Sequence, residues 1–134
     1  MGINVIANTG HLFSGAKIKA LADNYNLSMN PSGGFVLLDN KNRVLFSLNS
    51  FGGELMTAEN IRKVMVPGIT FLIDVPVVDS GLQVLDQVVV MAREFSKHLN
   101  GKVVDDNRVM LDEKEFRKIR SNLSEIYKKM DANG

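Results

Sequence analysis

Residues 69–75 read ITFLIDV, and this stretch decides the fold. Its β-branched and apolar residues, ended by Pro76, predict a central β-strand. Side chains alternate along a strand. One face therefore carries Ile69, Phe71, Ile73 and Val75, and the other carries Thr70, Leu72 and Asp74. Only the first face is apolar enough for a core, so this strand is expected to be covered on one side.

A β-hairpin is predicted upstream of this strand. Residues 34–38 and 44–48 are apolar runs separated by Asp39-Asn40-Lys41-Asn42, whose Asp and Asn residues favour a turn. Alternation in residues 45–51 places Phe46 and Leu48 on one side. The opposite side carries Leu45, Ser47, Asn49 and Phe51.

The remaining segments predict helices and short strands around these two features. Residues 3–7 form a strand, residues 14–24 a helix and residues 57–65 a short helix. The helix over residues 80–100 is indicated by a capping box of Ser80 and Gln83 and by Gly101 at its end. The predictions after it are short strands at 102–104 and 109–111 around a turn at 105–108, then a last helix capped by Asp112 and Glu115. This order predicts an α+β fold with mainly antiparallel strands and helices on one face.

The second face of the predicted sheet carries apolar residues without helical cover. Leu45, Phe51 and Leu72 fall there, and an exposed apolar patch marks a partner site. The alternative is that they are ordinary scattered surface hydrophobes. The pattern by itself leaves both interpretations open.

Composition narrows the class of protein. The 134 residues, 45% of them hydrophobic, fit one compact domain spanning 1–134. With 16 Lys and Arg against 15 Asp and Glu, the formal net charge is +1, too small to hold a nucleic acid or an anionic membrane non-specifically. There is no cysteine, which fits a reducing compartment. The apolar runs fall short of the ~20 residues of a membrane-spanning helix, so a soluble chain is expected.

Catalytic and metal-binding patterns are weak. His11 and His98 have no second ligand at metal-binding spacing. Residues 10–18 lack the Gly-Lys-Ser/Thr ending of a phosphate loop. Asp105 and Asp106 fit a solvated or capping pair better than a catalytic one. The sequence therefore predicts no enzyme, no metal and no cofactor.

Several motifs resemble one known family in both order and spacing. They are LFSL at 45–48, PGIT at 67–70, VP at 75–76, GKVVDDNR at 101–108 and DAN at 131–133. Together they resemble the cytoplasmic C-terminal domain of ZipA-like cell-division proteins, which binds FtsZ, the tubulin-like protein of the bacterial division ring. The resemblance covers almost the whole chain.

The resemblance implies a six-stranded, mostly antiparallel sheet with three helices on one face, of the split β-α-β type. It also implies a shallow apolar groove on the other face, where the C-terminal tail of FtsZ binds largely as a helix. The groove residues carried over are Phe51, Leu72, Thr70, Asn49, Arg108, Ser32 and Gly34. Better-known members have larger apolar side chains near Ser32 and Gly34, a lysine near Gly53 and a methionine in place of Phe51, so an altered groove shape is expected.

The family also carries an N-terminal membrane anchor and a linker. The resemblance therefore implies that Met1-Gly2 begins an excised, monomeric domain, whose full protein would tether FtsZ at the cytoplasmic face of the inner membrane at the division site. Two alternatives use the same sheet face: an RNA-binding domain and a small-ligand-binding domain. No Lys/Arg-Gly-Phe-Gly-Phe-type strand supports the first. No converging ionisable groups support the second.

Overall fold

A computed structural model describes residues 2–73 and 81–133, with side chains up to residue 129. Its main feature is a six-stranded sheet in which every neighbouring pair is antiparallel. The strand order across the sheet is β3 (Ser28–Met29), β4 (Phe35–Leu38), β5 (Val44–Ser50), β7 (Gly68–Leu72), β1 (Gly2–Ala7) and β8 (Gly101–Val104). A separate two-stranded ribbon pairs β2 (Phe13–Ser14) with β6 (Met65–Val66).

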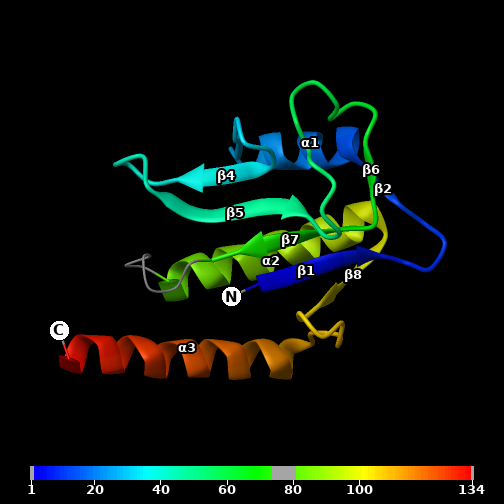
Figure 1. The fold of residues 1–134 in the computed structure, drawn as a ribbon. Helices are drawn as coiled ribbons and strands as arrows, with labels where there is room; N and C mark the ends of the chain where they lie inside the picture. The colour runs from blue at the N-terminus through cyan, green and yellow to red at the C-terminus, as the bar shows by residue number, and fades with distance from the viewer. Residues whose placement is uncertain (1, 74–80, 134) are drawn as a thin grey trace.

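Three helices complete the fold: α1 (Gly15–Asn24), α2 (Gly81–Leu99) and α3 (Glu113–Asn133). Figure 1 shows α1 and α2 behind the sheet, with β5, β7 and β1 toward the viewer. α2 packs on β1 and β8, and α3 packs on α2, below β8 in this view. The predicted α+β fold, with an antiparallel six-stranded sheet and three helices, is confirmed.

The core lies between the sheet and α2. Ile69, Phe71 and Ile73 are fully buried, as the alternation along β7 predicts. The ring of Phe71 meets the ring of Phe95 from α2 edge-on, with 5.4 Å between centroids. Leu72, on the opposite face, is 48% exposed. One face of β7 therefore belongs to the core and the other meets solvent.

Two local predictions are wrong. The helix predicted for residues 57–65 is a run of turns that leads into β6. Thr57 and Asn60 bond each other's backbone N–H groups through their side chains, and the Asn60 amide also donates to the Leu55 carbonyl oxygen. Such side-chain bonds to the backbone compete with helical hydrogen bonding. The strand predicted at 109–111 is a single bridge between Val104 and Met110.

The predicted caps have different outcomes. Asp112 accepts the N–H of Glu115 at 2.9 Å, as expected at the start of the last helix. Ser80, which was to cap α2, lies outside the described residues, as do residues 74–75 of the predicted central strand and Pro76 that was to end it.

Candidate binding groove

The register of the strands aligns five residues into a central row across the open sheet face. Asn49 lies opposite Thr70, Thr70 opposite Asn4, and Asn4 opposite Val104. Gly34 continues the row beside Asn49, because the next pair along is Phe35 with Leu48. Opposed residues on antiparallel strands point to the same face. The row is therefore uncharged from one end to the other.

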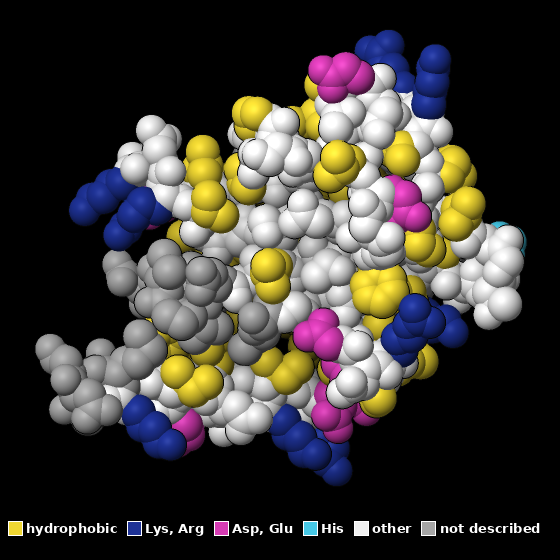
Figure 2. All heavy atoms as spheres, in the orientation of Figure 1, with side chains coloured by type: hydrophobic (Ala, Val, Ile, Leu, Met, Phe, Trp, Pro, Cys, Tyr) yellow, Lys and Arg dark blue, Asp and Glu magenta, His cyan; other side chains and the backbone are white. Residues whose placement is uncertain are grey.

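Two further rows flank the central one, two residues away along each strand. One contains Phe51, Gly68, Ile6 and Lys102, with the Phe51 N–H donating to the Gly68 carbonyl oxygen at 2.8 Å. The other contains Val36, Ser47, Leu72 and Gly2. Two members of these rows, Gly68 and Gly2, have no side chain: a Cβ would lie 2.7 Å from the Val5 carbonyl oxygen at residue 68 and 3.0 Å from Asp106 Oδ1 at residue 2. Figure 2 views this open face, where separate apolar side chains lie among uncharged surface, with acidic and basic side chains beside them and toward the edges.

The loop of residues 105–110 closes one side of the open face. Asp105 shapes the loop, since its Oδ1 accepts the N–H groups of Asn107 at 2.8 Å and Val109 at 2.9 Å. Asn4 and Val104 point to the open face yet are each only 1% exposed. Within the described residues, this loop contacts both of them: Asp106 bonds the Asn4 side chain, and Met110 forms a bridge with Val104. The open face thus has a wall beside β8 as well as a floor.

Arg108 extends from this loop over Phe51. Its Cζ lies 5.3 Å from the centroid of the Phe51 ring, within the range of a cation–π contact. Within residues 2–73 and 81–129, no carboxylate forms an ion pair with Arg108. Its guanidinium therefore places N–H donors at the rim, and none of the described carboxylates neutralises it there.

Beneath the loop, three polar side chains are joined. Thr70 Oγ1 donates to Asn4 Oδ1 at 2.6 Å, and Asn4 Nδ2 donates to Asp106 Oδ1 at 3.1 Å. The Thr70 hydroxyl proton is therefore already used in a hydrogen bond to Asn4. Thr70 can offer a ligand its methyl group, but it has no second proton to donate.

The structure brings six of the seven predicted groove residues together. Gly34, Asn49 and Thr70 share the central row, Phe51 and Leu72 flank it, and Arg108 covers Phe51. Ser32 is exposed in the turn before β4, where its N–H bonds Asn30 Oδ1 at 3.1 Å.

The backbone conformation and the close neighbours of residue 34 require a glycine at this position. Its φ is +76°, and a Cβ there would lie 2.3 Å from Asn49 Oδ1 and 2.6 Å from the Leu48 carbonyl oxygen. A side chain is therefore excluded at this point of the floor. A small hollow of about 140 Å³ opens beside it, bounded also by Gly53, Glu54 and Leu55.

Neither Asn4 nor the role of Asp106 was predicted from the sequence. One signal was available: Asn4 stands between Ile3 and Val5, where strand alternation puts a polar residue on the face opposite the core. The contact with Asp106, 102 positions away, has no such local signal.

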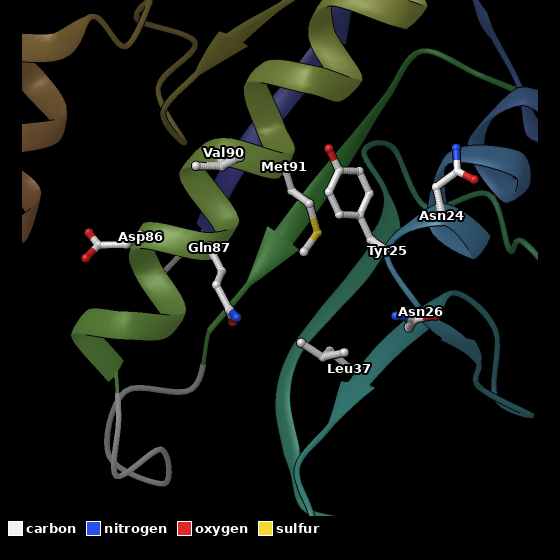
Figure 3. A pocket seen from close by; sticks show the side chains of 8 residues that line it. All are labelled: Asn24, Tyr25, Asn26, Leu37, Asp86, Gln87, Val90 and Met91. Atoms are coloured by element: carbon white, nitrogen blue, oxygen red, sulfur yellow. The ribbon is translucent and has the colours of Figure 1, made fainter.

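A second hollow lies on the helix side, away from the groove. Its volume is about 610 Å³, and Figure 3 shows Tyr25, Met91 and Leu37 around it. Burial, and secondarily the charge of Glu94, raises the pKa of the Tyr25 phenol. None of the predicted groove residues lines this hollow.

Among the described residues, no group of three or more His, Cys, Asp and Glu side chains is arranged to hold a metal ion. None of the helices in the described ranges combines the length and apolarity needed to cross a membrane.

A sheet covered by helices on one face, with apolar residues around an uncharged row on the other, is typical of α+β domains that bind another protein through the sheet. The comparisons identify which such domain this is. Residues 1–122 match the family described as ZipA, C-terminal FtsZ-binding domain, and the chain belongs to this family. It is thus an FtsZ-binding domain of the kind found in the cell-division protein ZipA. A comparison with curated proteins found no match.

Proposed function

We propose that the open sheet face binds the C-terminal tail of FtsZ in the groove floored by the three rows. The observation that carries this proposal is that Leu72 is exposed and Phe51 is partly exposed on a sheet face that none of the described helices covers. Exposed apolar side chains beside an uncharged row favour a ligand held mainly by apolar contact. Family membership supplies the identity of the partner.

The spacing of the two apolar residues suits a helical ligand. Phe51 lies opposite Gly68, four residues before Leu72 on the adjacent strand. This register separates the two positions by about 14 Å on the floor, since a strand rises ~3.4 Å per residue and neighbouring strands are ~4.8 Å apart. Apolar side chains two to three turns apart on one helix span about the same length, at ~5.4 Å per turn. An amphipathic helix can therefore place one anchor at each residue.

Arg108 would act at the rim of this groove. Its guanidinium donors lie beside Phe51 and can meet a carboxylate or a carbonyl oxygen of the tail. A charge at a rim changes the association rate and the salt dependence more than the affinity. We therefore assign Arg108 to orienting the tail and Phe51 and Leu72 to holding it.

In the cell, this binding would serve to tether the division ring. If the domain is joined to a membrane anchor, as the family resemblance implies, one end holds the inner membrane and the other holds FtsZ at the division site. Many weak tail contacts along a filament then add through avidity. We propose that the domain acts as a monomer, because a single groove accommodates a single helix.

A titration with a fluorescently labelled FtsZ C-terminal tail tests the proposal. The variant is Leu72→Ala, and the matched control is Val90→Ala, because Val90 is similarly exposed but lies on α2, across the sheet from the groove. Leu72→Ala should weaken tail binding at least tenfold, and Val90→Ala should leave it unchanged. Equal effects of the two variants, or binding of a labelled RNA oligomer in preference to the tail, would overturn the proposal.

A further inference from the structure

The wall of the groove is joined to the sheet by a partly buried polar contact. Asn4 bonds both Asp106 and Thr70, and it is 1% exposed. An ionised carboxylate can only accept hydrogen bonds, so Asn4 must turn its amide nitrogen toward Asp106. Its amide oxygen then faces Thr70, which supplies a proton. The contact is thus satisfied in one orientation.

Strand β1 also makes room for the Asp106 carboxylate. A Cβ at Gly2 would lie 3.0 Å from Asp106 Oδ1 and 3.6 Å from Thr70 Cγ2. The missing side chain at residue 2 leaves the space in which the carboxylate lies against the sheet. The loop is therefore fitted to β1 by shape as well as by the hydrogen bond to Asn4.

Arg108 follows Asp106 by two residues, in a tightly constrained backbone. Its φ of +64° is uncommon for a residue other than glycine. The Arg108 N–H donates to the Asp105 carbonyl oxygen at 3.0 Å, and the Asp105 carboxylate accepts the N–H groups on either side of Arg108. Since these hydrogen bonds fix the path of the backbone through the turn, the position of Asp106 determines where the Arg108 side chain begins.

We propose that Asp106 and Asn4 are positioning residues of the groove: their hydrogen bond holds the loop of residues 105–110 on the sheet and so keeps the Arg108 guanidinium over the Phe51 ring. The inference rests on the proposed function only in its effect on tail binding. The placement of Arg108 is a property of the free domain and can be measured without a ligand.

Asp106 can position Arg108 without being needed for the stability of the fold. Asp106 is itself exposed, and the turn that contains it is closed by Asp105. Removing the Asp106 carboxylate should therefore leave the turn and the core intact while releasing the loop from β1. The Arg108 side chain would then no longer be confined to the face of the Phe51 ring.

The test compares Asp106→Ala with Asp106→Asn, which keeps an oxygen that can accept from Asn4. Glu59→Ala serves as the control, because Glu59 is an exposed acid in the turns before β6. NMR of the free domain reports the Arg108 δ-methylene protons, which the ring current of Phe51 shifts upfield while the two groups are stacked. Anisotropy with the labelled FtsZ tail reports binding, and thermal melts report folding.

Asp106→Ala should remove the upfield shift and weaken tail binding about as much as Arg108→Ala does, because both changes take the guanidinium away from the Phe51 ring. Asp106→Asn should keep both near wild type, and Glu59→Ala should change neither. A retained upfield shift in Asp106→Ala would overturn the inference, as would unaltered tail binding. If the wild-type domain does not bind the tail, the proposed function fails, and the NMR comparison alone decides whether Asp106 positions Arg108.

Discussion

The Arg108 guanidinium lies over the Phe51 ring, with 5.3 Å between Cζ and the ring centroid, although 57 positions separate the two residues in sequence. One comes from the loop after β8 and the other from the end of β5. The contact joins the wall of the proposed groove to its floor. It also means that a change at either residue alters the surroundings of the other.

Phe51→Ala should weaken tail binding more than Arg108→Ala at moderate salt. Truncating a buried aromatic anchor typically costs ~2 kcal/mol, roughly a thirtyfold loss, whereas a rim charge mainly alters the association rate. The two effects should not add, because Arg108 has no ring to lie on once Phe51 is truncated. Anisotropy titrations of both single variants and the double variant, at low and high salt, measure this coupling. If Arg108→Ala abolished tail binding while Phe51→Ala still bound the tail, the binding site would have to be assigned to the 105–108 turn instead.

Thr70→Val should destabilise the domain more than it weakens tail binding. The substitution removes the proton donated to Asn4 Oδ1, and a buried polar group left without a partner costs ~1–3 kcal/mol. Thr70→Ser, which keeps the hydroxyl, is the control. Urea unfolding followed by circular dichroism measures the free energy of unfolding. If Thr70→Val proves as stable as wild type, the hydroxyl does not support Asn4 as described.

Gly34→Ala should destabilise the fold more than Gly53→Ala does. Both glycines have positive φ, +76° and +93°, so both substitutions carry the ~1–2 kcal/mol cost of a left-handed conformation. At residue 34 the new Cβ would also collide with Leu48 and Asn49, and this overpacking adds ~1–3 kcal/mol to the loss of stability. At residue 53 nothing lies within 4 Å of the new Cβ. Thermal melts of the two variants give the comparison. Equal melting temperatures would mean that Asn49 and Leu48 move aside for the new Cβ at little cost in stability.

Asp39 should make the β4–β5 hairpin sensitive to acid. The Arg43 backbone N–H, bonded to the Asp39 carboxylate together with the Lys41 N–H and the Arg43 side chain, lowers the pKa of Asp39 below its ordinary 3.8. A depressed pKa contributes stability above the unfolded-state pKa and loses it as the pH falls through the folded-state pKa. Asp39→Asn should therefore melt below wild type near pH 7, and the difference should shrink as the pH falls below about 4. A difference that stays constant with pH would exclude the charge as its cause.

The sequence by itself was sufficient for the strands that alternate cleanly and for the long amphipathic helices. In β7, the burial of Ile69 and Phe71 and the exposure of Leu72 follow from a two-residue period that depends only on neighbouring residues. The same local rule identified Phe51 and Leu72 as residues on the face opposite the core. Local rules failed at residues 57–65, where helical spacing gave no sign that the Asn60 side chain would bond the backbone.

Only the tertiary structure decided how the groove is assembled. The central row joins Gly34, just before β4, with one residue from each of β5, β7, β1 and β8, and its order depends on strand registers that no single segment determines. The contacts of Asn4 with Asp106 and of Arg108 with Phe51 form because the chain returns from β8 over the open face. Periodicity describes which way a side chain points along its own strand, whereas the partner of that side chain depends on which strand pairs beside it.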